Sequence, residues 1–256
     1  MVECPEFVKG ARFVLGEALR HSAPPIRKMR RMEEVCLNRS GSQFNAEAAG
    51  RIRQAGEAVR FKYLLTSFQL EELWTLSTAC RWELVTAIHR PTEDRWDADE
   101  TILGSHYLES FLMQARAFLD LFLRYGCLLL KADAPITAKL KQRRKALNRV
   151  AEEPFGQRAL RLLGYLDQEV FAKDKWGAVL RDLRDRIAHR DMLHPSDDGT
   201  EEVAGSRLAW PTIQSMTFER LGQGFENGMF EMIRDTAPML FNLEWKSVPY
   251  RHDLWD

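Results

Sequence analysis

Apolar residues recur at three- and four-residue intervals along almost the whole chain, which is the period of an α-helix. The clearest case follows Asp97 and Asp99, whose carboxylates suit a helix N-terminus. We therefore predict a helix from there to about Leu130, the longest of the chain. Its buried stripe should consist of Leu108, Phe111, Leu112, Ala115, Phe118, Leu119 and Phe122. The same period elsewhere predicts an all-α fold built as a helical bundle.

Prolines, glycines and polar clusters divide the rest of the pattern into shorter helices. Pro24 and Pro25 should break the chain, and Thr66 and Gln69 have the spacing of a capping box. A stop and turn is predicted at His194–Gly199, and a short extended segment at Val203–Trp210. The predicted helices are Phe7–Leu19, Asn45–Phe61, Ser67–His89, Lys139–Val150, Gln157–Phe171, Asp174–Met192 and Thr212–Phe241.

The best internal boundary lies at Arg90–Trp96, where a proline, a threonine and acidic residues cluster. It divides an N-terminal helical region, residues 1–96, from a second region, residues 97–256. Whether residues 1–96 form a domain or extend the same bundle stays open at this point. In the last predicted helix, Gly222, Gly224 and Gly228 do not match a dinucleotide-binding fingerprint, so they indicate close packing or a local irregularity.

The charge balance excludes a protein that coats nucleic acid through its overall field, because 37 basic residues offset 37 acidic ones. A local basic groove is still compatible with it. The N-terminus carries acids where a signal peptide would be basic, and the most apolar segment, Ala115–Leu130, contains Arg116, Asp120 and Arg124. We therefore expect no membrane span and a cytoplasmic location.

Neither a metal nor a cofactor is expected. The four cysteines lie far apart, without metal-ligand spacing, and are predicted to be buried free thiols: Cys4, Cys36, Cys80 and Cys127. His189, Asp191 and His194 do not share one helix face, which argues against a metal site. The chain also has no phosphate-binding glycine loop.

The helix predicted at Asp174–Met192 carries a polar ridge opposite its apolar face. At about 100° per residue, the face toward the core consists of Trp176, Val179, Leu180, Leu183 and Ile187. Arg184 then lies on the flank of this stripe, while Asp185 and His189 point away from the core.

These three residues suit RNA cleavage without a metal. An imidazole with a pKa near neutral can take the proton of a ribose 2′-hydroxyl, and a guanidinium can stabilise charge on phosphate oxygens. His189 and Arg184 are candidates for these roles, and Asp185, one helical turn before His189, for orienting the imidazole ring.

The motif Arg184-Asp185-Arg186-Ile187-Ala188-His189 resembles that of the HEPN superfamily of helical bundles, in which an arginine and a polar residue precede a histidine after four to six intervening positions. The resemblance covers the architecture of roughly residues 97–245. It implies a HEPN-type bundle with an additional N-terminal helical region. It also implies a metal-independent endoribonuclease, dimeric, of a toxin–antitoxin, phage-defence or RNA-processing system, with a protein antitoxin or partner. Other members only bind RNA, nucleotides or proteins.

Two clusters of basic residues are candidates for contacts with an RNA backbone. The first comprises Lys139, Lys141, Arg143, Arg144 and Lys145, and the second comprises Arg27, Lys28, Arg30 and Arg31. A solvated face balanced by acids elsewhere is the alternative for each.

Three hypotheses remain at this point. The first is a HEPN-like endoribonuclease that leaves 2′,3′-cyclic phosphate ends. The second is a non-catalytic HEPN-like module that binds RNA or a protein partner, and the third is a structural protein of another helical family.

Overall fold

The computed structural model describes the backbone of residues 24–39, 43–88, 98–188, 196–203, 206–213 and 216–247, and the side chains of 24–39, 43–72, 108–186 and 221–246. A helix at 24–38 comes first. The other helices are α2 (Ala46–Ile88), α3 (Ala98–Leu129), α4 (Leu140–Leu147), α5 (Phe155–Tyr165) with its π-helical continuation η1 (Leu166–Val170), α6 (Trp176–Ala188), α7 (Phe218–Phe241) and the 3-10 turn η2 (Trp245–Ser247). The strands are β1 (Ser196–Val203), β2 (Ser206–Ile213) and β3 (Met216–Thr217).

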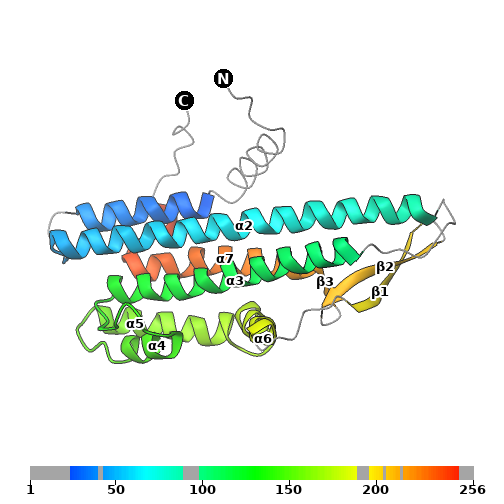
Figure 1. Ribbon diagram of the computed structural model, residues 1–256. Coiled ribbons are helices and arrows are strands. Elements are labelled where there is room, and N and C mark those ends of the chain that lie inside the picture. The colour runs from blue at the N-terminus through cyan, green and yellow to red at the C-terminus, as the bar shows by residue number, and fades with distance from the viewer. Residues whose placement is uncertain are drawn as a thin grey trace, which may run out of the picture.

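The helices form three layers (Figure 1). The helix at 24–38 and α2 make one outer layer, α3 and α7 lie in the middle, and α4, α5 and α6 make the other outer layer. The predicted helical bundle is thus confirmed. The helix predicted at Phe7–Leu19 and the boundary at Arg90–Trp96 lie outside the described residues.

The apolar stripe of α3 forms the centre of the core, as predicted. All seven residues of the predicted stripe are at most 1% exposed. The helix packs against α2 on one side and against α4, α6 and α7 elsewhere. Ring contacts tie these layers together: Tyr63 of α2 lies 5.7 Å from Phe118, and Phe225 of α7 lies 5.5 Å from Phe111, measured between ring centroids.

The segment from Asn45 to His89, predicted as two helices, is largely one continuous helix, α2. With 43 residues it is longer than α3, which has 32, so the prediction that α3 is the longest helix is wrong. Thr66 does not cap a new helix, because its hydroxyl donates to the carbonyl of Lys62, one turn earlier, at 2.7 Å. Thr66 and Ser67 are buried, so packing of this face keeps the helix unbroken where polar residues indicated a break.

Pro24 and Pro25 lie in the described part of a helix that runs to residue 38. The residues before Pro24 lie outside the described part, so the break predicted at these prolines stays a prediction. The apolar side chains of this helix, Ile26, Met29, Met32 and Leu37, belong to the same hydrophobic cluster as those of α3 and α7. Residues 24–88 therefore extend the one bundle.

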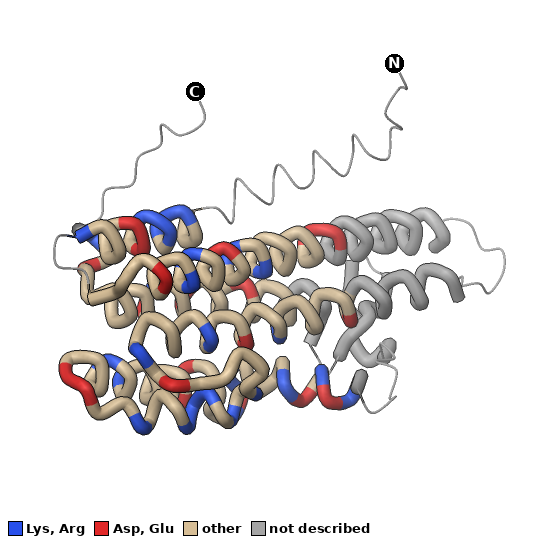
Figure 2. Tube along the Cα trace, turned by 60° about the vertical axis from the view of Figure 1, so that its left-hand side comes forward, with Lys and Arg blue, Asp and Glu red and all other residues tan. Residues whose placement is uncertain are grey.

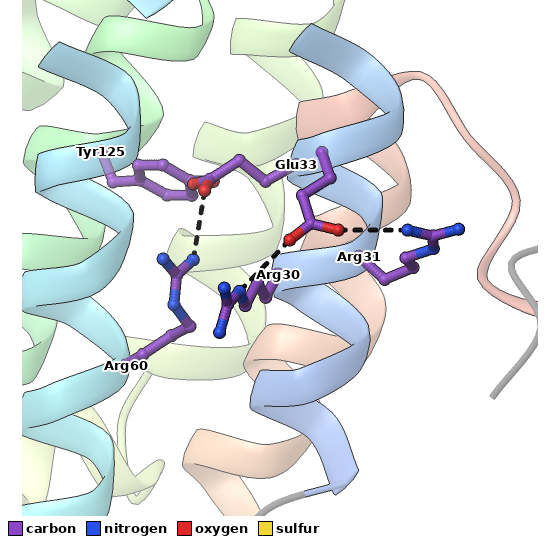
Figure 3. A network of polar contacts seen from close by, with 6 residues as sticks. Arg30, Arg31, Glu33, Arg60 and Tyr125 are labelled. Atoms are coloured by element: carbon purple, nitrogen blue, oxygen red, sulfur yellow. Dashed lines mark hydrogen bonds and ion pairs between the residues drawn. The ribbon is translucent and has the colours of Figure 1, made fainter. Parts of the chain in front are cut away.

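A buried carboxylate joins the helix at 24–38 to the two helices beside it (Figure 3). Glu33 is 2% exposed and accepts a hydrogen bond from the Tyr125 hydroxyl of α3 at 2.5 Å. It also accepts one from the Arg60 guanidinium of α2 at 3.4 Å. A Cβ at Gly56 would lie 2.1 Å from the Glu33 carboxylate, so only glycine leaves room for this contact. Burial raises the pKa of Glu33, and its bonds to Tyr125 and Arg60 oppose that shift.

A small antiparallel sheet, in the order β1-β2-β3, lies at one end of the bundle (Figure 1). The extended segment predicted at Val203–Trp210 lies partly within it. The turn predicted at His194–Gly199 is wrong for its last four residues, which belong to β1, with an irregular register between Ser196 and Gly199. Strand pairing has outweighed local turn preference here. Consequently α7 begins at Phe218, not at Thr212.

Two glycines of α7 allow close helix packing, as predicted. A Cβ at Gly222 would lie 2.2 Å from Leu70 of α2, and a Cβ at Gly228 would lie 2.3 Å from the indole of Trp176. Gly224 has no such neighbour. Within the described part of the chain, no helix is long and apolar enough to cross a membrane.

The substitution Glu33→Gln should remove a pH dependence from the free energy of unfolding. Because the pKa of Glu33 is raised on folding, the native protein keeps this proton at pH values above 4.5, where the unfolded chain releases it. The stabilisation is complete below that ordinary value and is lost as pH rises through the folded pKa. Urea unfolding should be measured over this pH range for wild type and Glu33→Gln. The free energy of unfolding of wild type, minus that of the variant, should decline as pH rises. A difference that stays constant with pH would contradict a raised pKa of Glu33 as the cause.

The matched control is Glu34→Gln. The Glu34 carboxylate pairs with Arg30 and Arg31, whose side chains are well exposed. Exposed pairs of this kind contribute about 0–1 kcal/mol, so Glu34→Gln should change the free energy of unfolding only slightly.

Candidate functional site

The helix α6 carries the predicted motif and is fixed to the bundle by its apolar face. Leu180 and Leu183 are fully buried and belong to the main hydrophobic cluster. At the start of the helix, the ring of Trp176 packs edge-on against Phe225 of α7, with 6.5 Å between centroids. These contacts decide which face of α6 points outward and confirm the predicted orientation of the described residues. The side chain of Ile187 lies outside the described residues.

Arg184 and Asp185 both lie on the outward side of α6. Their side chains are 41% and 49% exposed, and Nη1 of Arg184 donates to Oδ1 of Asp185 at 3.0 Å. The Arg184 Nε is buried and has no hydrogen-bond partner among the described residues. An ion pair this exposed is weak, so the guanidinium can exchange Asp185 for a phosphate.

His189 lies outside the described residues, so the structure does not test its predicted convergence with Arg184. Among the described residues, Asp185 contacts Arg184. The role of Asp185 as the residue that orients His189 stays a prediction.

The basic segment from Lys139 forms α4, and its members differ sharply in exposure. Lys139, Lys141 and Lys145 are exposed, and no described carboxylate forms an ion pair with them. Arg144 is half-buried, pairs with Asp167 and lies over the ring of Phe171 at 5.4 Å. The exposed part of the predicted RNA-binding set is therefore the three lysines. In the second basic cluster, Arg30 and Arg31 are exposed and pair with Glu34.

Arg143 departs from the prediction, because it is buried at 7% exposure. Its guanidinium donates to the backbone carbonyls of Asp120 in α3 and Ile136 in the preceding loop. Burial lowers the pKa of Arg143, and nearby Asp120 opposes that shift. Arg143 therefore attaches α4 to α3 and is not on the exposed face that an RNA would contact.

A cleft at the end of the bundle away from the sheet was not predicted. It has a volume of about 190 Å³ and is lined by residues from five separate segments, among them Cys36, Phe44, Leu129, Arg158 and Leu243. Their distance in sequence explains why no local pattern indicated it.

Two of the four cysteines predicted to be buried free thiols lie among the residues whose side chains are described. Cys36, half-buried, and Cys127, buried, are both free. Burial raises the pKa of each thiol, that of Cys127 to about 11. Cys4 and the side chain of Cys80 lie outside the described residues. Within the described part, no three His, Cys, Asp or Glu side chains gather as metal ligands.

The substitution Arg143→Ala should lower the free energy of unfolding by about 2–3 kcal/mol, because two buried carbonyls lose a charged donor. Chemical denaturation measures this change. The control Lys141→Ala removes an exposed cation from the same helix and should change stability by no more than about 0.5 kcal/mol. Equal effects of the two substitutions would contradict the structural role of Arg143.

Comparisons with protein-family models, curated proteins and solved structures find no match for this chain.

Proposed function

We propose that this chain is a HEPN-like, metal-independent endoribonuclease whose motif is Arg184-Asp185-Arg186-Ile187-Ala188-His189. The observation that carries the proposal is the position of Arg184. Its guanidinium lies on the outward side of a helix that Leu180 and Leu183 hold in the core. A phosphate-binding group in a catalytic site needs both access to the substrate and a fixed support.

In the proposed reaction, the His189 imidazole takes the proton of a ribose 2′-hydroxyl. The 2′-oxygen then attacks phosphorus, the bond from phosphorus to the 5′-oxygen breaks, and the departing 5′-oxygen takes up a proton. Arg184 stabilises the charge that builds on the non-bridging oxygens. The products are a 2′,3′-cyclic phosphate and a free 5′-hydroxyl.

A homodimer would complete the proposed site. The helix α6 belongs to an outer layer of the bundle (Figure 1), where a second subunit has access to it. Two copies of the motif facing each other would enclose one phosphodiester and exclude water from it, which strengthens the electrostatic contribution of Arg184. A cytoplasmic toxin–antitoxin or phage-defence system, with a protein antitoxin as partner, is the proposed setting.

A non-catalytic RNA-binding module is the second candidate, and the exposed face of α4 supports it. Lys139, Lys141 and Lys145 present three ammonium groups without ion-pair partners among the described residues. Contacts between such groups and phosphates supply affinity without sequence preference or chemistry. Along the chain trace, which Figure 2 colours by charge, α6 alternates basic and acidic residues, whereas α4 contains basic residues and no acidic one.

RNA cleavage in excess chelator tests the enzymatic proposal. His189→Ala should slow cleavage by about 10²–10⁴-fold, and Arg184→Ala by about 10²–10³-fold. Arg181→Ala is the matched control, because Arg181 lies on the same helix, is 52% exposed and pairs with its neighbour Asp182. Cleavage that requires a divalent metal, or that survives His189→Ala, would remove the assignment.

RNA affinity measured over a series of salt concentrations tests α4. Replacing Lys139, Lys141 and Lys145 together by Gln should reduce the slope of log K against log salt by up to about 2, at about 0.7 per phosphate contact in single strands. The control replaces Lys131 and Lys175, which already pair with Glu152 and Glu169. If binding is seen without cleavage and the slope falls only in the triple variant, the non-catalytic module is the better description.

A further inference from the structure

We propose that the cleft lined by Cys36, Arg39, Phe44, Phe155 and Arg158 binds a compact organic oxyanion, a phosphate or carboxylate attached to an aromatic or apolar body. The cleft lies between the ends of α3 and α7, the start of α5, and described residues from 36–39 and 43–44. These elements meet at the end of the bundle away from the sheet (Figure 1), and no residue of α6 lines the cleft, so it is separate from the site proposed on α6.

The charged residues among the described lining of the cleft are all basic. Two arginines, Arg39 and Arg158, are among the described residues that line it, and none of these residues is acidic. No ion pair joins either arginine to a described carboxylate. Arg158 is half-buried and Arg39 is exposed, so both guanidinium groups can meet an anion that enters the cleft.

Arg158 is held in place with unused capacity for hydrogen bonds. Its Nη1 donates to the carbonyl of Leu240, near the end of α7, at 3.2 Å. Its guanidinium stacks on the ring of Phe155 at 4.6 Å from the centroid. The Nε is buried, so a ligand cannot reach it, whereas Nη2 has no hydrogen-bond partner among the described residues. A guanidinium fixed in this way, with Nη2 left over, is preorganised for an oxyanion.

The start of α5 adds a second positive contribution. Pro154 and Phe155 line the cleft at the first turn of this 11-residue helix, and no side chain caps its N-terminus. The Gly156 N–H is bonded to the Glu152 carbonyl, and the positive end of the helix dipole favours an anion there. The guanidinium groups and the helix end thus act in the same direction.

The rest of the lining is mixed, because Gln43 and Asn242 are polar and a cluster of apolar side chains lies beside them. A ligand with an apolar body can contact this cluster, which a fully hydrated ion cannot do. Phe44 and Phe155 meet edge to face, with 6.4 Å between their centroids, and Leu129, Phe241 and Leu243 complete the apolar lining. A volume of about 190 Å³ holds one small ring with its acidic group, but lies below the range of about 300–1,000 Å³ typical of drug-sized ligands. Burial raises the pKa of the Cys36 thiol, so its alkylation is measured at alkaline pH, where more of the reactive thiolate is present.

Calorimetric titration of the full chain with phenyl phosphate and with benzoate tests the proposal. At least one should bind saturably, and the two arms distinguish a phosphate from a carboxylate ligand. Inorganic phosphate and phenol should each bind more weakly. Inorganic phosphate lacks the apolar body, and phenol lacks the oxyanion. Absence of saturable binding of both organic anions overturns the proposal, and inorganic phosphate binding as tightly as phenyl phosphate overturns the apolar half of it.

Variants of three arginines test whether the organic anion binds in this cleft. Arg158→Gln should weaken the affinity by about tenfold or more, as expected for the loss of a charge-assisted hydrogen bond. Arg39→Gln changes an exposed side chain, so it should weaken binding without unfolding the chain. Arg161→Gln is the matched control, because Arg161 is exposed on the same helix, α5, and does not line the cleft. Equal binding by all three variants overturns the location.

Cys36 supplies a readout that does not depend on any arginine variant. Saturating phenyl phosphate should slow its alkylation by iodoacetamide, followed by peptide mass spectrometry, whereas phenol should not. Unchanged alkylation of Cys36 at saturation contradicts binding in this cleft. RNA cleavage by the motif on α6 is measured separately, so failure of either proposal leaves the other standing.

Discussion

The burial of α3 is the constraint on which the rest of the bundle depends. Its apolar side chains are hidden on more than one face, and α2, α4, α6 and α7 all pack on it. Removal of this surface from water, at about 25 cal/mol per Å² of apolar area, is the main force that holds the layers together. Each covering helix needs only one apolar face for this purpose. The outward faces of α4 and α6 are therefore free to carry charge, and the two proposed RNA contacts lie there.

Buried polar groups add specificity to this packing. Glu33 is met by Tyr125 from α3 and by Arg60 from α2, while Arg143 is met by carbonyls of α3 and the loop before α4. Each group would be costly to bury without partners, so each favours one placement of its helix over shifted ones. Gly56 belongs to the same arrangement, because a side chain there would displace the Glu33 carboxylate.

Three arginines show how the fold decides what a guanidinium does. Arg143 is buried and donates to two carbonyls, so its role is structural. Arg184 is partly exposed and, among the described residues, pairs with its neighbour Asp185, so it can exchange that partner for a phosphate. Arg158 is fixed on Phe155 and Leu240 beside a cavity whose described lining residues include no acid. The three roles differ in which N–H donors the fold leaves without a partner and in what those donors face. Residue type alone does not distinguish them.

The sequence by itself determined the helical class, the buried stripe of α3, the position of Arg184 on the flank of the apolar stripe and the outward position of Asp185, because helical periodicity is a local property that fixes which side chains share a face. Only the tertiary structure decided that α2 runs unbroken past Thr66, that residues 196–203 pair as a strand and that Arg143 is buried. It alone formed the cleft around Arg158. These outcomes depend on packing and pairing between segments that are far apart in the chain, and such contacts leave no periodic signal in any one of them.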